Sequence, residues 1–341
     1  MSSSPPPTGR PRVAFSMTDA KLRDALLPPA VRQRLDRVAT VVSEEVLTSY
    51  DTTEARAILA ETDVLLTGWG AGRVTPEVLD AAPGLRLVAH AAGSVRAVFD
   101  PACYDRGVMV TTSAQANAWP VAQWTLAMVL LAGKKVVPRS RAFKASRARS
   151  RPWQAPVGNF GITIGIIGAS RIGRLVLDEL PRHGYRLLLA DPTVTAEQAR
   201  ALGAELVSLP ELMASSDIVS LHAPILESTK GMITAELLST MKDGATFINS
   251  ARGILVDHDG LRAEARTGRI DLILDVTLPE PLPDDDELWD LPNVWLTPHL
   301  AGAQGREVGT LGLSAVTEIE QLAAGLPYVH PVPADAYEAT A

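Results

Sequence analysis

Side chains suited to acid–base chemistry and anion binding follow three predicted strands in the second half of the chain. Arg252 follows one strand, Asp275 and Glu280 lie at the end of a second and beyond it, and His299 follows a third. In an open parallel sheet, the carboxyl ends of the strands form the edge at which ligands bind. We therefore expect a cation, a carboxylate and an imidazole at one edge of a sheet.

These residue types suit a definite kind of chemistry when they lie together. Arginine stays charged at any working pH and binds a carboxylate through two parallel hydrogen bonds. A histidine beside a carboxylate is the usual proton-transfer pair, because the carboxylate orients the ring and stabilises its protonated form. Taken singly, Arg252 could pair with a structural acid and His299 could be a structural histidine. Together, the set suits proton transfer to or from an oxygen of a substrate, with the arginine holding a neighbouring carboxylate.

A nucleotide site is predicted from residues 162–176. The run 162–167 is a buried strand, Gly168 makes a tight turn, and Gly173 lets the following helix pack on the strand. That helix should begin near Arg171 and direct its unpaired N–H groups at a pyrophosphate. Ser170 stands where the pattern usually has its middle glycine. An ordinary buried strand–helix–strand unit is the alternative.

Asp191 predicts which dinucleotide is bound. It ends the strand 187–190 and lies 23 residues beyond Gly168. A carboxylate at this position accepts a hydrogen bond from the ribose 2′-OH and repels a 2′-phosphate. We therefore expect NAD rather than NADP as the cofactor.

Strands and helices alternate along the chain and predict an α/β fold with a doubly wound parallel sheet. The first set of strands is expected at 13–15, 64–67, 87–89 and 108–111, and the second near 162–167, 186–190, 205–207, 217–221, 246–249, 271–276 and 294–297. Helices are expected at 119–137, 234–241, 259–267 and about 304–324, among others. The last helix should return to the first set.

Two Rossmann-like or flavodoxin-like domains are therefore expected. The NAD-binding domain, 117–302, is inserted into a smaller, discontinuous substrate-binding domain, 1–116 and 303–341. The first ten residues lack the apolar core of a signal peptide, and the apolar stretch 121–137 is too interrupted for a membrane span. The net charge of −7 argues against nucleic-acid binding. The single cysteine argues for a cytoplasmic protein with no disulfide.

A dense basic segment, 139–151, separates the two sets of strands. It could be an anion or nucleic-acid patch. Because acidic residues predominate in the chain as a whole, a solvated or subunit-packing arm is favoured.

The chain resembles the D-isomer-specific 2-hydroxyacid dehydrogenases over nearly its whole length. The matching stretches, in the family's order and spacing, are Gly165–Gly173, Leu221–Pro224, Met241–Gly253, Asp275–Pro281 and Leu291–Gly302. The resemblance implies that His299 is the general acid/base, that Glu280 is its carboxylate partner, and that Arg252 binds the substrate's carboxylate and carbonyl oxygen. It also implies a homodimer built largely through the NAD-binding domain.

The resemblance further implies which residues contact the ligands. The substrate loop is Ala92, Gly93 and Ser94, whose backbone N–H groups would bind the carboxylate. The cofactor residues expected are Gly168, Ser170, Arg171, Ile172, Asp191, His222, Ala223, Pro224, Thr229, Ser250, Ala251, Arg252, Asp275, His299 and Gly302. No metal is expected.

Several positions depart from the family pattern. Thr277 replaces a usual aromatic residue, 278–279 is less polar than usual, and the spacing from Arg252 to Glu280 is one residue shorter than the commonest form. Arg96 stands where the family more often has an acidic or neutral residue. It could be a surface side chain, or a second cation that favours a substrate with a second anionic group.

The sequence thus predicts an NAD-dependent oxidoreductase that interconverts a small 2-oxo acid and its D-2-hydroxy acid, with a small anionic substrate as partner and no membrane or nucleic-acid partner. One alternative is oxidation of phosphite or of a phosphonate-type substrate within the same family. Another is an NAD-sensing binding protein like the family's transcriptional corepressors.

Overall fold

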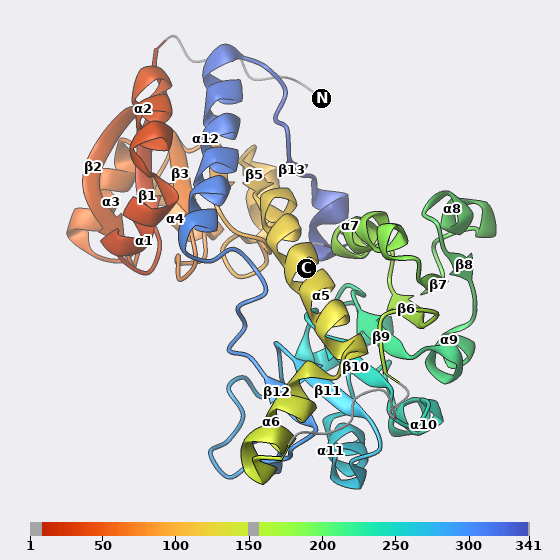
Figure 1. Ribbon diagram of the computed structural model, residues 1–341. Helices are drawn as coiled ribbons and strands as arrows, with labels where there is room; N and C mark the ends of the chain where they lie inside the picture. The colour runs from red at the N-terminus through yellow and green to blue at the C-terminus, as the bar shows by residue number, and fades with distance from the viewer. Residues whose placement is uncertain (1–8, 149–156, 340–341) are drawn as a thin grey trace. The chain divides into compact units, whose positions relative to one another are not determined.

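The computed structural model describes residues 9–148 and 157–339 and divides the chain into two compact units. Unit 1 comprises Met1–Asn117 and Ala303–Ala341, and unit 2 comprises Ala118–Gly302. Each unit is built on a mainly parallel sheet with helices packed against it (Figure 1). The predicted α/β class is confirmed. The N-terminal segment 1–8 and positions 149–151 of the basic segment lie outside the described residues.

The sheet of unit 1 has the strand order β13-β5-β4-β3-β1-β2. All pairings in it are parallel except that of β13 with β5. Its strands are β1 (Arg12–Ser16), β2 (Thr40–Leu47), β3 (Val64–Thr67), β4 (Leu87–His90), β5 (Met109–Thr112) and β13 (Pro331–Val332).

Apolar side chains cover both faces of this sheet. On β1, Val13 and Phe15 belong to one buried cluster and Ala14 to another, because successive side chains of a strand point to opposite faces. The helices of unit 1 are α1 (Ala20–Leu26), α2 (Pro29–Val38), α3 (Thr53–Ala60), α4 (Pro76–Ala81) and α12 (Val308–Ala324). The helix α12 packs beside α1 and α2, so the C-terminal part of the chain completes this core (Figure 1).

Two strands of this sheet were not predicted from the sequence. The strand β2 is an edge strand in which most side chains are partly or fully exposed, and its sequence mixes polar with apolar residues. The strand β13 has only two residues and starts with a proline, which an edge position tolerates.

The sheet of unit 2 is parallel throughout, with the order β12-β11-β10-β9-β6-β7-β8. Its strands are β6 (Thr163–Ile167), β7 (Arg186–Ala190), β8 (Glu205–Leu206), β9 (Ile218–Leu221), β10 (Thr246–Asn249), β11 (Asp271–Leu274) and β12 (Val294–Leu296). The strand order reverses at β6: the chain runs outward from β6 to β7 and β8 and then returns to β9, on the other side of β6. Ligands bind at such a switch point in open parallel sheets.

Helices in unit 2 pack against the sheet and form two buried apolar clusters with it. They are α5 (Ala114–Gly133), which begins in unit 1, and α6 (Val136–Ser146), α7 (Arg171–Glu179), α8 (Ala196–Ala201), α9 (Leu209–Ser215), α10 (Ala235–Thr240) and α11 (His258–Thr267). The helices α10 and α11 pack together on one side of the sheet, so α11 has a fixed position from which it can support nearby loops.

The helix expected at 119–137 is interrupted near its C-terminal end. The chain instead forms α5 and α6, with Lys135 between them in the left-handed region at φ 52°. Segment 158–159 ends α5, because the Gly158 N–H and the Asn159 side-chain amide donate to carbonyls of the last helical turns. A side chain at Gly133 would collide with Asn159, so only a glycine leaves room for the Asn159 side chain there.

The basic segment is helical over its first part. Residues 139–146 belong to α6, and Arg141 donates two hydrogen bonds of 2.8 Å to the carbonyls of Pro292 and Val294. The last helix also starts later than expected, at Val308, after a short 3-10 turn.

No helix within the described residues is long and apolar enough to cross a membrane. The same part of the chain contains no cluster of three side chains suited to holding a metal ion.

Candidate functional site

The predicted site residues of unit 2 lie where strands of its parallel sheet end. Gly168 follows β6, Asp191 follows β7, and His222 follows β9. Arg252 lies three residues beyond β10, and Asp275 comes directly after β11. Because parallel strands end at the same edge, these positions share one edge of the sheet.

The turn after β6 has room only for a glycine. Gly168 has φ +94°, and a Cβ atom there would lie 2.7 Å from the backbone nitrogen of Ala223. A Cβ atom on Gly173 would lie 2.0 Å from the Gly168 carbonyl oxygen. The backbones of 168, 173 and 223 therefore pack in direct contact, and the turn presents main chain rather than side chains. This close-packed turn before a helix fits the binding of a pyrophosphate.

Ser170 has a local role that the sequence pattern did not reveal. Its hydroxyl is the N-cap of α7 and accepts a hydrogen bond of 3.3 Å from the Gly173 N–H. Serine is among the preferred N-cap residues because its side chain satisfies a free N–H of the first turn. Helix α7 then begins at Arg171, as predicted, with Ile172 as its second residue.

Asp191 is bonded to the turn that it faces. Its Oδ2 accepts a hydrogen bond of 2.7 Å from the Ala169 N–H, and its Oδ1 accepts bonds from the N–H and hydroxyl of Thr193. Partial burial favours the protonated form, but these bonds and the charge of Arg174 outweigh it and lower the pKa of the carboxyl group. Asp191 is therefore an anion at neutral pH, held against the turn.

The loop after β9 packs against the turn at Gly168. His222 is buried, its Nε2 lies 2.9 Å from the Ser220 hydroxyl, and burial lowers its pKa to about 4. It is therefore neutral at pH 7. Pro224 accepts a hydrogen bond of 2.7 Å from the Thr229 hydroxyl, which closes the loop 224–229 on itself.

His299 and Glu280 form a pair within unit 2. The His299 Nδ1 lies 2.6 Å from Glu280 Oε1. The two side chains are 49% and 41% exposed, so solvent or a ligand can reach both. With Nδ1 engaged by the carboxylate, Nε2 is the ring nitrogen left to exchange a proton with another molecule. This is the arrangement that general acid–base catalysis requires.

The backbone at His299 is held in an uncommon conformation. Its φ is 50°, in the left-handed region, which costs about 1–2 kcal/mol for a residue with a side chain. Asp275 secures it: the Asp275 carbonyl accepts from the His299 N–H, and the carboxylate accepts from Thr297, Leu300 and Ala301 at 2.6–2.9 Å. Asp275 thus shapes the segment that carries His299 and that ends at Gly302.

Arg252 is presented by a turn that Asn249 stabilises. The Asn249 side chain accepts from the Ala251 N–H and donates to the Arg252 carbonyl, both at 3.0 Å. Ser250, between them, is buried with its hydroxyl 3.4 Å from that of Thr125. Burial lowers the pKa of Arg252, and nearby Glu280 opposes that shift. The guanidinium stays charged, because an arginine pKa lies far above neutrality.

Gly253 connects the arginine turn to the loop that carries Glu280. A Cβ atom on Gly253 would lie 2.1 Å from the Thr277 carbonyl oxygen and 2.8 Å from the Leu278 nitrogen. The two segments are therefore in backbone contact. Since Arg252 and Thr277 flank this contact, a shift of either segment moves the other. Sequence reasoning missed this role, although a glycine directly after a rim arginine was a signal.

The predicted substrate loop belongs to unit 1 and follows β4. The Ala92 carbonyl accepts from the Thr112 hydroxyl and from the Ser113 N–H, at 3.2 and 3.0 Å. The Gly93 carbonyl also accepts from the Thr112 hydroxyl. The loop backbone is thus fastened to the end of β5.

Two further residues of unit 1 bear on this loop. His90 is buried, with its Nδ1 2.9 Å from the Thr67 hydroxyl, and burial lowers its pKa to about 4, against a hydrogen bond to the Ser94 backbone. It links the ends of β3 and β4 as a neutral ring. Arg96 is half-buried, and its carbonyl accepts from Arg73 and Tyr337 at 3.3 Å.

Comparison with known proteins places this site in context. The family model described as D-isomer specific 2-hydroxyacid dehydrogenase, NAD binding domain, matches residues 126–301. D-3-phosphoglycerate dehydrogenase of Mycobacterium leprae is 33% identical over 276 residues, which cover 81% of this chain and 52% of that protein. Glyoxylate reductase of Korarchaeum cryptofilum is 34% identical over 235 residues, covering 67% and 70%. The chain spans about half the length of the phosphoglycerate dehydrogenases that it matches.

Solved structures share the fold. The TT0316 protein from Thermus thermophilus is 29% identical with a TM-score of 0.77, covering 94% of this chain and all of that one. The NAD-complexed D-isomer specific 2-hydroxyacid dehydrogenase from Lactobacillus delbrueckii ssp. bulgaricus has a TM-score of 0.80 over 94% of this chain and all of that one. At 20% identity, that likeness concerns the fold alone.

Proposed function

Because the chain belongs to the D-isomer-specific 2-hydroxyacid dehydrogenase family and contains its NAD-binding domain, we propose that it interconverts a small 2-oxo acid and the corresponding D-2-hydroxy acid with NAD. The contact between His299 Nδ1 and Glu280 Oε1, with Arg252 close enough to interact electrostatically with Glu280, carries this proposal. It joins a proton carrier, its anionic partner and a carboxylate-binding cation in one unit.

In the direction of reduction, protonated His299 donates its Nε2 proton to the carbonyl oxygen of the substrate as that oxygen becomes a hydroxyl. Glu280 holds the ring and stabilises its charge before the transfer. Arg252 binds the carboxylate and stabilises negative charge on the carbonyl oxygen. When bound, the nicotinamide supplies the hydride, so that hydride and proton together convert the ketone to the alcohol. Oxidation reverses these roles.

The dinucleotide fits the described turn. The glycine turn at 168, the N-terminus of α7 and the carboxylate of Asp191 would hold the pyrophosphate and the ribose. The remaining predicted cofactor positions, from His222 to Thr229 and from Ser250 to Arg252, follow β9 and β10 at the same edge of the sheet.

A panel of acids tests the function directly. Oxidation of NADH should be followed with glyoxylate, pyruvate and larger 2-oxo acids, and reduction of NAD with D-3-phosphoglycerate and phosphite. Turnover of any 2-oxo acid to the D-hydroxy acid supports the proposal. Tight NADH binding with no turnover of any member contradicts it and favours the NAD-sensing alternative.

A substrate with a second anionic group is the second candidate. Arg96 lies two residues after the 92–94 loop and is half-buried, so a cationic residue is close in sequence to the amides proposed to bind a carboxylate. Phosphite and phosphate-bearing hydroxy acids belong to this class, which is why the panel includes them.

We also propose that two copies associate through unit 2. The helix α6 exposes Val136 and Phe143, which are 41% and 57% exposed. Apolar side chains of this size are commonly covered in interfaces between subunits.

Cofactor preference should follow from Asp191. NADPH would bring its 2′-phosphate against this carboxylate, so we expect kcat/KM to favour NADH by tenfold or more, at least ~1.4 kcal/mol. Arg174, whose charge acts on Asp191, limits the discrimination. Steady-state kinetics with both cofactors measures the ratio. Equal values for the two would contradict the assignment of Asp191.

Replacing Glu280 with glutamine should lower kcat for reduction. The Glu280 carboxylate lies 2.6 Å from the His299 ring, where it orients the ring and stabilises its positive charge, whereas an amide can orient the ring but carries no charge. KM should change little, because Arg252 is still present to bind the substrate. Steady-state kinetics of both proteins measures the two quantities. An unchanged kcat would assign the role to another carboxylate.

A further inference from the structure

The ring of His258 lies directly behind the turn that presents Arg252. His258 is the first residue of α11 and is 9% exposed. Its Nε2 lies 3.2 Å from the carbonyl oxygen of Gly253. Because a carbonyl can only accept, Nε2 must carry the proton and donate it. The other ring nitrogen, Nδ1, is buried without a hydrogen-bond partner among the described residues.

The hydrogen bond from His258 to Gly253 matters for the position of the turn more than for the stability of the protein. Burying an unpaired ring nitrogen is costly, and this offsets much of what the bond to Gly253 contributes to stability. The ring does, however, fix the peptide after Arg252. Gly253 is in turn in backbone contact with Thr277 and Leu278. Leu278 precedes Glu280 by two residues in the same loop.

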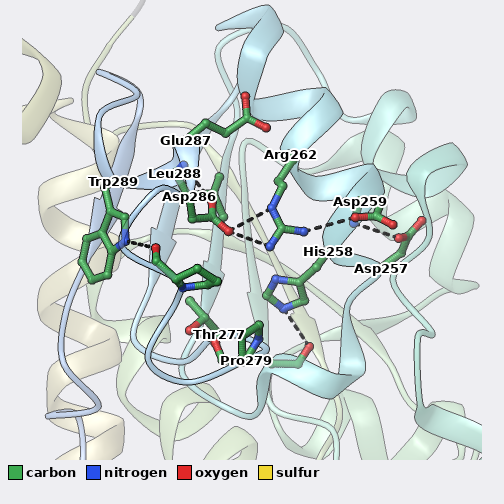
Figure 2. A network of polar contacts seen from close by, with 12 residues as sticks. Asp257, His258, Asp259, Arg262, Thr277, Pro279, Asp286, Glu287, Leu288 and Trp289 are labelled. Atoms are coloured by element: carbon green, nitrogen blue, oxygen red, sulfur yellow. Dashed lines mark hydrogen bonds and ion pairs between the residues drawn. The ribbon is translucent and has the colours of Figure 1, made fainter.

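Helix α11 also holds the far end of that loop. Arg262, one turn after His258, donates hydrogen bonds of 2.7 and 3.1 Å to the carboxylate of Asp286, which is only 5% exposed. Figure 2 shows His258 and Arg262 pointing from α11 toward the segment that carries Thr277, Pro279 and Asp286. One helix face thus contacts the arginine turn and the loop of the proton-transfer pair.

We propose that His258 is a positioning residue: through its Nε2–H bond to the Gly253 carbonyl, it sets the Arg252 turn and, through Gly253, the loop that carries Glu280. The proposal deepens the function given above, on which its kinetic part rests. His258 does not touch the substrate. It acts by keeping the guanidinium of Arg252 at a fixed position relative to His299 and Glu280.

The test compares His258→Leu, which removes the donor, with His258→Gln, whose amide can donate to the same carbonyl. For the best 2-oxo acid of the panel, His258→Leu should raise KM and lower kcat, with kcat/KM falling by about 10- to 100-fold, because small misplacements of a binding group have effects of this size. The Kd for NADH should change less than KM, since most of the proposed cofactor contacts follow β6, β7 and β9 rather than β10. His258→Gln should recover most of the loss.

Arg262→Met is the matched control on the same helix. It removes the pair with Asp286 but leaves the His258 bond in place, so it should lower the midpoint of thermal unfolding and raise KM much less than His258→Leu does. Equal KM effects in His258→Leu and Arg262→Met would overturn the proposal, because they would indicate a general loosening of α11.

Hydrogen exchange gives a readout that does not need turnover. In His258→Leu, backbone amides of 251–256 and 275–282 should exchange faster, while those of 163–167 should not change. His258→Gln should again resemble the wild type. Unchanged exchange at 251–256 overturns the proposal, whereas failure of the wild type on the whole acid panel overturns only the proposed function. Gly253→Ala, which keeps His258 but pushes on Thr277, provides a second variant and should show the same two effects.

Discussion

Replacement of His299 by alanine should lower turnover of the 2-oxo acid by about 10²- to 10⁴-fold, the usual contribution of a positioned general acid–base group. The Kd for NADH should change little, because the turn at 168 and the carboxylate of Asp191 remain. Single-turnover oxidation of NADH, with binding followed by fluorescence, measures the two quantities separately. Because the His299 side chain is half exposed, the variant should keep its fold.

His299→Gln provides a control for this variant, since the amide can still bond Glu280 but cannot exchange a proton at neutral pH. It should be as inactive as the alanine variant. Wild-type activity in either variant across neutral pH would show that another group transfers the proton.

Replacement of Arg252 by alanine should lower kcat/KM for every 2-oxo acid by about 10²-fold or more, at least ~2.8 kcal/mol, because each presents the carboxylate that the guanidinium is proposed to bind. Arg252→Lys keeps the charge but loses the two parallel hydrogen bonds, so it should recover only part of the loss. Steady-state kinetics with a small and a large 2-oxo acid checks that the loss is uniform. A loss confined to one acid would mean that Arg252 contacts the substrate's side chain.

Arg96→Ala supplies the contrast to Arg252. If Arg96 binds a second anionic group, its removal should cost roughly 10- to 150-fold in kcat/KM, ~1.5–3 kcal/mol, for doubly anionic substrates only. The difference should shrink as salt screens the charge. Equal effects on pyruvate and on a doubly anionic acid would make Arg96 an ordinary surface residue.

The core of the fold could be predicted from local sequence because burial leaves a local signature. The strand β6 is buried at every position, and its run of branched apolar residues predicts both the strand and the turn that follows it. The edge strand β2 has no such signature, since solvent covers much of it. The break between α5 and α6 depends on Asn159, which approaches Gly133 from 26 residues further along the chain, and no local pattern reports that contact.

The candidate site also has residues that the sequence predicts and contacts that it does not. Arg252, Glu280 and His299 could be proposed from their types and their places after strands, because that edge of a parallel sheet binds ligands. The supporting contacts could not. The bond from His258 to the Gly253 carbonyl and the three bonds to the Asp275 carboxylate join groups whose directions are set only when the chain has folded.

The bonds of Asp191 bear on any attempt to engineer this protein for NADPH. Exchanging the aspartate for a small neutral residue would remove the repulsion of a 2′-phosphate, but it would also release the Ala169 N–H and the Thr193 hydroxyl from their acceptor. The turn that is proposed to bind the phosphates would lose its hydrogen-bond acceptor in the same step. A redesigned cofactor pocket would therefore need a replacement acceptor for Ala169 as well as a cation for the phosphate, and the two changes would have to be selected together.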